Sequence, residues 1–324
     1  MSVLLIFIDG LGIGEDNSHV NPCANNAFTL FNIVKSDIPK KPLPYGGSMV
    51  SIDATLGIEG LPQSATGQTA LLTGVNSARI LGYHKQGFPN NKLRDILREN
   101  SVLKKVVEQE GKAAFLNAFR PRFFQYRIEE IVSKLSVTTV ANWVAGLSFF
   151  ALQDVVDRRA LYQDFTNIDL IARGFKMPVF TPHEAGEILA SEAQKFDFCL
   201  YEYFKTDHAG HSQNMNRATE EIVKLEEFLM SLLSRIDLDQ NTLIVTSDHG
   251  NIEDLSVRTH TKNKVPAMVW GSNVIQAERL HSLTDIVPFI LERIEYMSRS
   301  ETKENKNVGS TLEFYHGKEV IPCQ

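Results

Sequence analysis

The sequence is poor in cysteine, and its three cysteines are scattered. Cys23, Cys199 and Cys323 lie far apart and show no metal-binding spacing. Small secreted domains that depend on disulfides carry their cysteines in even numbers at closer spacing. We therefore expect no disulfide framework, a reducing compartment and a cytoplasmic location.

Long apolar runs are also missing. The run at residues 3–8 is only six residues long, no basic residue precedes it, and Asp9-Gly10 follows it directly. A secretory signal has a basic start and a longer apolar part, and a membrane span needs about 20 apolar residues. We interpret residues 3–8 as a buried strand and expect a soluble protein without a membrane partner.

Positive charge is not in surplus either. Lysine and arginine number 33 against 39 acidic residues, which leaves a formal net charge of −6. Proteins that bind a nucleic-acid backbone or an anionic membrane usually carry a basic surface. We expect no nucleic-acid partner, and a small molecule as the substrate.

The chain does contain the pattern of a large α/β domain. With 324 residues, of which 43% are hydrophobic, it can bury a sizeable core. Short apolar runs alternate with amphipathic stretches, which predicts a three-layer sandwich: a mostly parallel central sheet flanked by helices. The expected strands are residues 3–8, 113–118, 198–204, 243–246 and 265–270, and the expected helices are residues 92–110, 182–195, 216–236 and 284–295.

Residues 119–179 interrupt this alternation. The segment begins with Arg120, Arg122 and Arg127 and has an apolar middle, so we interpret it as a small inserted cap. The core domain would then consist of residues 1–118 and 180–324. Arg120 and Arg122 are candidate substrate-binding residues, because guanidinium groups clamp phosphate or carboxylate groups, although scattered arginines are more often surface residues. The polar stretch at residues 298–307 predicts a mobile loop.

Two polar residues in the N-terminal part of the chain are candidates for the site. Asp9 comes directly after the first expected strand and before a glycine-rich turn, where an aspartate is most often a turn residue. Ser64 precedes a predicted short helix that ends at Gly74. A serine there is commonly a helix cap, but free N–H groups and the helix dipole also suit a nucleophile that holds a phosphoryl group.

Two further motifs follow later strands and carry possible metal ligands. Asp207 and His211 are four residues apart after the strand at residues 198–204, and we expect them to converge across a turn that Gly210 permits. We expect His208 to point elsewhere. Asp248-His249 follows the strand at residues 243–246, and His260 comes eleven residues later. Random scatter would rarely place imidazoles at successive strand ends.

Together these residues form a donor set for two metal ions. Three carboxylates and three imidazoles suit borderline ions such as Zn²⁺ or Mn²⁺ better than Mg²⁺ or Ca²⁺. Two such ions can activate a serine hydroxyl and stabilise an in-line phosphoryl transfer. The set consists of Asp9, Asp207, His211, Asp248, His249 and His260.

At this point the motifs resemble the alkaline phosphatase superfamily, and most closely its branch with cofactor-independent phosphoglycerate mutase and phosphopentomutase. Asp248-His-Gly-Asn251 followed by His260-Thr-Lys-Asn-Lys-Val-Pro266 carries the resemblance, together with the spacing of Asp207 and His211. The segment from Asp9 to Glu15 is similar to the phosphopentomutase opening.

The resemblance implies roles for individual residues. Ser64 falls in the register of the family nucleophile, with Thr66 as a fallback, and Gln68 stands where the mutases usually carry histidine. Thr66 and Gln68 are therefore also candidates for contact with the substrate. One ion would be held by Asp207, His211 and His260, and the other by Asp9, Ser64, Asp248 and His249. Mn²⁺ is the ion implied first, and Zn²⁺ is the alternative.

The functions that remain open share a phosphorylated small substrate. The first is a phosphatase or phosphodiesterase that uses a phosphoserine intermediate, and the second is a phosphomutase. Mutases need a cap that retains the intermediate, and the expected cap at residues 119–179 is short. A non-catalytic protein that binds a ligand through its metals is the third. A metallopeptidase is excluded because the His-Glu-x-x-His signature is absent.

Overall fold

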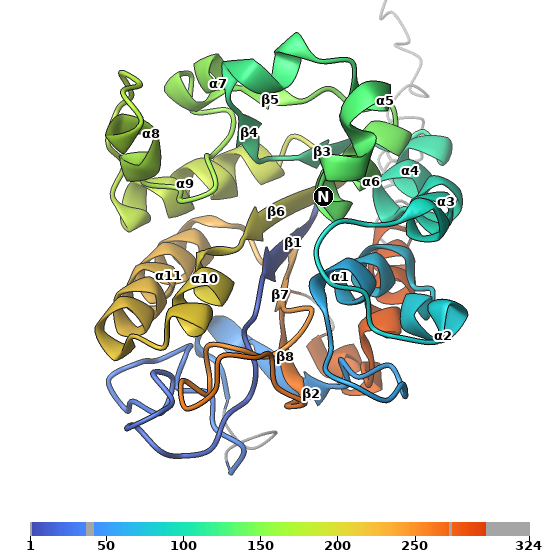
Figure 1. Cartoon of the computed structure of the whole chain (residues 1–324). Coiled ribbons are helices and arrows are strands. Elements are labelled where there is room, and N and C mark those ends of the chain that lie inside the picture. Colours follow the sequence, from blue (N-terminus) through green and yellow to red (C-terminus); the bar gives the residue numbers. More distant parts are fainter. Residues whose placement is uncertain (1, 37–41, 272–273, 296–324) are drawn as a thin grey trace, which may run out of the picture.

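Six strands form the central sheet of the computed structural model, which describes residues 2–36, 42–271 and 274–295. The stretch at residues 298–307 and Cys323 lie outside the described residues. The order across the sheet is β2-β8-β7-β1-β6-β3 (Figure 1). β1 pairs in parallel with β6 and β7, and β6 pairs in parallel with β3, whereas β8 is antiparallel to β7 and β2. The strands are β1 (Val3–Ile8), β2 (Ser48–Ile52), β3 (Ala113–Phe115), β6 (Phe198–Tyr203), β7 (Thr242–Thr246) and β8 (Val265–Trp270).

The predicted strand at residues 113–118 is wrong in its second half. β3 ends at Phe115, and β4 (Ala118–Phe119) pairs instead with β5 (Phe150–Ala151) in a separate small sheet. Asn117 lies between them, and its side chain exchanges two hydrogen bonds with the backbone of Glu202. The Asn117 side chain thus satisfies the backbone N–H and C=O of Glu202 in place of a neighbouring strand. The chain can therefore leave the sheet after β3 without leaving these groups unpaired.

Helices cover both faces of the sheet, as Figure 1 shows. β1 demonstrates the two faces: Leu4, Ile6 and Ile8 pack in the core layer under α9 and α11, and the alternate residues pack under α1, α4 and α6. The predicted mostly parallel α/β sandwich is therefore confirmed. The helices are α1 (Ser64–Thr73), α2 (Ser77–Leu81), α3 (Asn91–Asn100), α4 (Val102–Glu108), α5 (Ile128–Ile131), α6 (Val137–Val144), α7 (Leu152–Val156), α8 (Ile168–Ala172), α9 (Pro182–Ala193), α10 (Lys205–Ser212), α11 (Met215–Arg235) and residues 286–295.

The expected helix at residues 92–110 is two helices, α3 and α4, that meet at Ser101. This residue has extended backbone angles, with φ −53° and ψ 130°, and it is fully buried. Asn100 and Ser101 are residues whose side chains compete with helical hydrogen bonds, which explains a break at this position. The apolar stripe of α11 is confirmed, because Ile222, Leu225, Leu229 and Leu232 are all buried.

The segment at residues 119–179 contains α5 to α8 together with β5 and short 3₁₀ turns at Pro121–Gln125 and Val132–Lys134. Most of these elements lie along the top of Figure 1, beside the β3 edge of the sheet. α6 differs, because Val137, Val140 and Ala141 belong to the core layer under α1. The division into a core at residues 1–118 and 180–324 and a cap at residues 119–179 stays a prediction.

Among the residues that the structure describes, no helix combines the length and the apolar character needed to cross a bilayer.

Candidate metal centre

Three neighbouring strands bring the predicted ligands to one place. Asp9 directly follows β1, Asp248 and His249 follow β7, and α10 starts two residues after β6. β1 lies between β6 and β7 and is parallel to both, so the three carboxyl ends meet at one edge of the sheet. Ligands bind at this edge in open α/β sheets.

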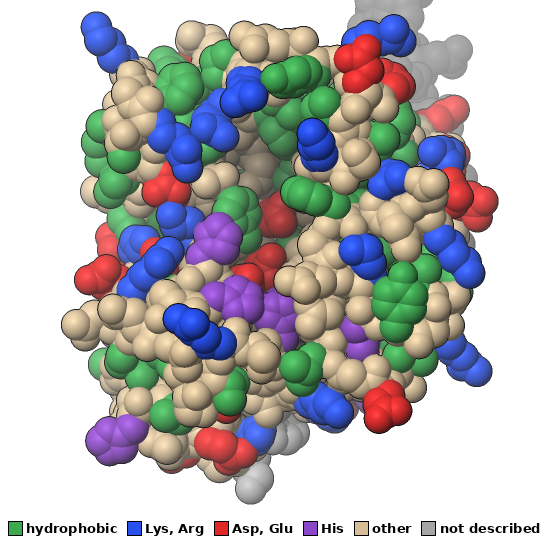
Figure 2. Space-filling model, in the orientation of Figure 1, with side chains coloured by type: hydrophobic (Ala, Val, Ile, Leu, Met, Phe, Trp, Pro, Cys, Tyr) green, Lys and Arg blue, Asp and Glu red, His purple; other side chains and the backbone are tan. Residues whose placement is uncertain are grey.

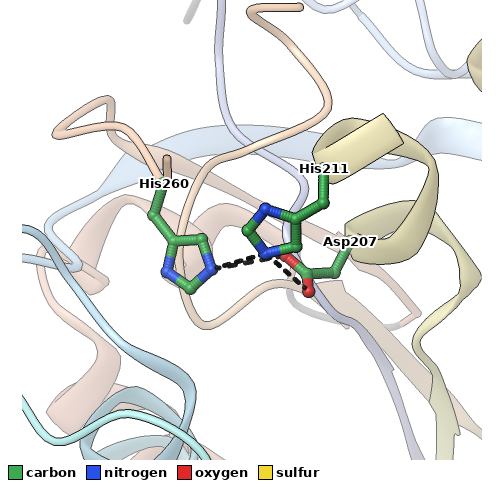
Figure 3. Close-up of side chains that lie close together, drawn as sticks. All are labelled: Asp207, His211 and His260. Carbon is green, nitrogen blue, oxygen red and sulfur yellow. Dashed lines mark hydrogen bonds and ion pairs between the residues drawn. The ribbon is translucent and has the colours of Figure 1, made fainter. Parts of the chain in front are cut away.

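The first cluster consists of Asp207, His211 and His260 (Figure 3). The Nε2 atom of His211 lies 3.3 Å from Oδ2 of Asp207 and 3.3 Å from Nε2 of His260. The Nε2 atom of His260 lies 3.5 Å from Oδ1 of Asp207. The ligand atoms of all three residues lie within 4.8 Å of one another, as a shared cation requires.

Asp207 and His211 converge on a helix and not across the turn that the sequence suggested. Both lie on α10 one helical turn apart, so their side chains share a face. Gly210 is helical as well, and a Cβ atom there would lie 2.6 Å from Oδ1 of Asn251. The glycine therefore permits close packing of α10 against the loop after β7. His208 points elsewhere, as expected, with its ring against Phe204.

The second cluster consists of Asp9, Asp248 and His249, and it is almost completely buried. The Nε2 atom of His249 lies 3.3 Å from Oδ1 of Asp9 and 3.4 Å from Oδ2 of Asp248. Those two carboxylate oxygens are buried and have no hydrogen-bond partner. A buried carboxylate oxygen without a donor is costly, and a cation between the two side chains would satisfy it.

The imidazoles are oriented so that Nε2 faces the centre. Nδ1 of His260 lies 2.8 Å from the carbonyl oxygen of Pro62, and Nδ1 of His211 lies 2.7 Å from that of Arg258. A carbonyl oxygen can only accept, so Nδ1 carries the proton and Nε2 of each neutral ring presents its lone pair. A hydrogen bond of this kind at the far nitrogen is usual for histidines that ligate metals.

His249 connects the two clusters and the candidate nucleophile. Its ring stacks on that of His260 with centroids 3.7 Å apart. Its Nε2 atom also lies 3.0 Å from the hydroxyl oxygen of Ser64. Ser64 is the first residue of α1, whereas Gln63 has the extended backbone of the capping position and makes no side-chain cap bond. The Ser64 hydroxyl therefore faces the centre.

Burial and mutual repulsion dominate the electrostatics of the second cluster. Burial, followed by the charge of Asp207, raises the pKa of Asp248 to about 7. Burial, followed by the charge of Asp248, also raises the pKa of Asp9. The pKa of His249 falls to about 3, because burial and the charge of His260 both disfavour protonation. The second cluster therefore combines a neutral imidazole with two carboxyl groups that have no positive charge beside them.

The first cluster has the opposite character. Burial opposes the charge on Asp207, but hydrogen bonds from the protonated form of His260 and from Asn251 hold the pKa of this carboxyl well below its usual range. Burial lowers the pKa of His260, but the hydrogen bond that Asp207 accepts from the protonated ring outweighs burial and raises it. The two clusters fit two cations by their donors and their burial. The role of each residue as a ligand stays a prediction.

The four candidate substrate-binding residues lie in different places. Gln68 is buried, and its amide donates a hydrogen bond of 3.3 Å to Asp9. Thr66 faces away from the centre: its hydroxyl donates to the carbonyl oxygen of Gln63 and accepts from the backbone of Lys85. Thr66 is thus not placed as a nucleophile. Arg120 and Arg122 line a separate cavity near β6.

The sequence reasoning missed two residues that hold the centre together. Glu253 is 1% exposed, and its carboxylate accepts hydrogen bonds from the backbone of Gly12 at 3.0 Å and of Asn251 at 2.7 Å. It also accepts from the side chains of Thr261 and Asn263. The amide of Asn251 in turn donates to Asp207 at 2.6 Å. No sequence motif identifies Glu253 as a functional residue. The glycines that pack against it are the one feature of the sequence that could have pointed to it.

Those glycines are Gly12 and Gly250, which flank the carboxylate from two different loops. A Cβ atom at either position would lie 2.2 Å from Oε1 of Glu253. One carboxylate therefore connects the loop after β1, the loop after β7 and the segment that leads into β8. Each of these three segments also carries a predicted metal ligand.

The comparisons with known proteins agree with this fold. Residues 183–297 match the model of the Metalloenzyme superfamily. A cofactor-independent phosphoglycerate mutase from the alga Antithamnion sp., named 2,3-bisphosphoglycerate-independent phosphoglycerate mutase, is 33% identical over 114 residues. That match covers 32% of this chain and 22% of the relative, so the chain matches only about a fifth of that protein.

Solved structures show the same fold over most of the chain. The PH0037 protein from Pyrococcus horikoshii has a TM-score of 0.55 at 15% identity and covers 91% of this chain and 96% of its own. The alkaline phosphatase from the Antarctic bacterium TAB5 has a TM-score of 0.51 at 14% identity, with 91% and 98% covered. In residues 183–297 the chain therefore has the sequence pattern of the Metalloenzyme superfamily. It is distantly homologous to the cofactor-independent phosphoglycerate mutases.

We predict that Glu253→Gln lowers the free energy of unfolding by roughly 2–3 kcal/mol, because an amide cannot accept from all four donors and places its own N–H₂ against them. Metal affinity should fall as well. The neighbouring Asp254→Asn is the control. Among the described residues, the carboxylate of Asp254 accepts hydrogen bonds only from Ser256, and it does not pack against Gly12 or Gly250. Denaturant unfolding and metal titration measure both effects. Equal losses in the two variants would contradict the role of Glu253.

We also predict how pH changes the stability of the metal-free protein. Asp9, Asp248 and His260 have raised pKa values, so the native state binds more protons than the unfolded state near neutrality. The stability that these groups contribute is present at low pH and is lost as the pH rises through their native pKa values. His249 is neutral in the native state, and it opposes this change only slightly because its imidazole is already about half deprotonated in the unfolded chain at pH 6.5.

The midpoint of thermal unfolding in the presence of a chelator should therefore fall by roughly 5 °C between pH 6.5 and pH 8.5. Bound Mn²⁺ or Zn²⁺ should remove the fall, because cations stabilise the ionised carboxylates. Scanning calorimetry with and without metal makes the measurement. A metal-free midpoint that rises with pH over this window would show that the carboxyl groups are not repelling one another.

Proposed function

We propose that the protein is a metal-dependent phosphatase that transfers the phosphoryl group of a small phosphate ester first to Ser64 and then to water. The observation that carries the proposal is the position of the Ser64 hydroxyl. Its oxygen lies 3.0 Å from Nε2 of His249, at the junction of the two predicted metal clusters. A serine that served only as a helix cap would have its hydroxyl turned toward its own helix.

The surroundings of Ser64 favour a phosphoryl group. Ser64 begins α1, so the N–H groups of the first turn and the positive end of the helix dipole lie beside it. Gly67 allows α1 to approach closely, because a Cβ atom there would lie 2.7 Å from the carbonyl oxygen of Asp248. Gln68 lies one helical turn after Ser64 on α1, and its side-chain amide donates a hydrogen bond to Asp9. The nucleophile and the anion-binding groups thus come from one rigid element.

In the proposed reaction the Ser64 oxygen forms a bond to phosphorus as the bond between phosphorus and the ester oxygen breaks. The hydroxyl proton ends on the departing alcohol. Water then cleaves the phosphoserine, which restores Ser64 and releases inorganic phosphate. Divalent cations held by the two clusters would lower the pKa of the Ser64 hydroxyl and offset the negative charge of the phosphoryl oxygens. Mn²⁺ is the proposed ion and Zn²⁺ the alternative, since the donors are carboxylates and imidazoles.

A phosphomutase is the second candidate, and the names of the curated relatives favour it. In that reaction the phosphoserine would return its phosphoryl group to another hydroxyl and not to water. The part of the Antithamnion sp. enzyme that this chain matches is only 22% of that enzyme, which limits what its name implies here. We therefore place hydrolysis first.

We expect His260→Ala to retain the fold and to lose one of two bound ions. His260 is one of three donors in the first cluster, whereas the second cluster does not include it. Native mass spectrometry after loading with Mn²⁺ or Zn²⁺ counts the ions. His208→Ala is the control, because His208 lies outside both clusters on the same helix as His211, and it should keep two ions. Retention of both ions by His260→Ala would remove His260 from the ligand set.

Ser64→Ala should lower the release of phosphate at least about 10³-fold, because the reaction then lacks its nucleophile. Thr66→Ala should stay within about tenfold of the parent, since its hydroxyl faces away from the centre. Suitable esters are sugar phosphates, phosphoglycerates and a nitrophenyl phosphate, each tested with Mn²⁺ and with Zn²⁺. Isomerisation without phosphate release would support the mutase. Tight binding of these esters without any turnover would instead indicate a non-catalytic binding protein.

A further inference from the structure

A cavity of about 340 Å³ lies beside the proposed metal centre. Its volume falls in the range of about 300–1,000 Å³ that is common for small-molecule sites. Figure 2 shows the hollow on this face, with histidine side chains gathered below it and lysine and arginine side chains along one side. The walls come from the segment between β3 and α5, from residues near Tyr162 and from the end of β6.

One wall of the cavity is aromatic. Phe119 and Phe123 contribute to it, and their rings lie 4.3 Å apart between centroids. Phe149 packs edge-on against both rings, at 5.1 Å and 4.9 Å. Because these three rings hold one another, the wall has a fixed shape. Aromatic rings bind other flat rings by stacking or edge contacts, each of which contributes about 0.5–1.5 kcal/mol beyond buried area.

The cavity lining also contains a buried acid. Glu202 lines the cavity and is only 7% exposed, and one of its oxygens accepts a hydrogen bond of 2.6 Å from Thr138. The two hydrogen bonds with Asn117 fix the backbone of Glu202. A carboxylate in this position can accept a hydrogen bond from a donor on the edge of a ligand ring.

The cavity and the metal centre are neighbours. Glu202 is paired with Phe7 in the sheet, and the backbone N–H of Asp9 donates to the carbonyl oxygen of Tyr203, so the two carboxyl groups come from the ends of adjacent strands. Phe204 lines the cavity and immediately precedes α10, the helix that carries Asp207. A ligand whose phosphoryl group reaches Ser64 can therefore extend its remaining part into the cavity.

The arginines that the sequence marked as candidates also line this cavity. Arg120 and Arg122 are both exposed, and Arg122 donates a hydrogen bond of 3.4 Å to the Tyr126 hydroxyl. Two guanidinium groups at the opening favour the entry of an anionic ligand.

Resting on the proposed function, we propose that this cavity binds the leaving group of the substrate, and that this group is an alcohol bearing a flat aromatic ring with a hydrogen-bond donor on its edge. The ring lies against Phe119 and Phe123, and the donor faces Glu202. Nucleobases such as adenine carry such a donor as an amino group on the ring edge, whereas an aryl phosphate ester offers the flat ring without the donor. A short polyol phosphate has no apolar face to bury against the aromatic wall and leaves its hydroxyls unpaired there.

The test compares three esters with the metal-loaded, full-length protein. Adenosine 5′-monophosphate carries a nucleobase, O-phosphotyrosine carries a phenol-type ring, and glycerol 1-phosphate carries no ring. We expect kcat/KM to be at least about tenfold higher for one or both ring-bearing esters than for glycerol 1-phosphate. Which of the two is preferred identifies the source of the ring.

Variants of the aromatic wall separate ring binding from general effects. Phe123→Ala should lower kcat/KM for the preferred ring-bearing ester about tenfold and leave glycerol 1-phosphate within about twofold. Phe123→Leu keeps most of the apolar volume without a flat ring and serves if the alanine variant does not fold. Phe88→Ala is the matched control, because Phe88 is 52% exposed and is not part of the cavity lining. It should change neither ester.

Two outcomes overturn the inference while the proposed function stands. One is that glycerol 1-phosphate is turned over as well as both ring-bearing esters, and the other is that the Phe123 variants weaken all three esters equally. Absence of turnover for every ester would contradict the proposed function instead. Calorimetric binding of adenosine 5′-monophosphate to the parent and to Phe123→Leu then decides the cavity's role, since equal affinities would show that it binds no ring.

Discussion

The structure depends on one electrostatic constraint, the meeting of three carboxylates at the end of the central sheet. Asp9, Asp207 and Asp248 come from three neighbouring segments, and two of them are almost fully buried. Oδ1 of Asp9 and Oδ2 of Asp248 have no hydrogen-bond partner, whereas all the acceptor capacity of the nearby Glu253 is directed at four donors. A satisfied buried carboxylate has a structural role. The unsatisfied pair of carboxylates, Asp9 and Asp248, needs a cation or a proton. The fold also supplies imidazole lone pairs that can bind a cation.

Much of this centre could be predicted from the sequence because its parts are local. Apolar strands that end in Asp9 or in Asp248-His249 place those side chains at the carboxyl edge of a parallel sheet without further information. The helical state of Asp207 to His211 could not be predicted in this way. The sequence there is polar and contains Gly210, so no apolar period shows, and packing against Asn251 decides the conformation.

The remaining features depend on contacts between distant segments. Asn117 ends β3 because its side chain takes over hydrogen bonds of β6, which lies more than eighty residues later. Glu253 has no motif of its own, and its hydrogen-bond partners come from distant loops, such as Gly12 after β1 and Asn263 before β8. Nor does any spacing indicate that Phe119, Phe123 and Glu202 surround one cavity. Such features follow from the three-dimensional arrangement alone.

The matched family segment contains only part of the centre and part of the cavity, and this bears on how the relatives should be interpreted. The matched family segment, residues 183–297, contains five of the predicted ligands, including Asp207 and His260. It does not contain Ser64 or the aromatic wall at Phe119 and Phe123. The segment thus covers five predicted ligands and the cavity residues Glu202 and Phe204, while the candidate nucleophile and the aromatic wall lie outside it. Mutases and phosphatases can share such a centre and still differ in substrate, because the wall can change without disturbing the sheet edge that holds the ligands.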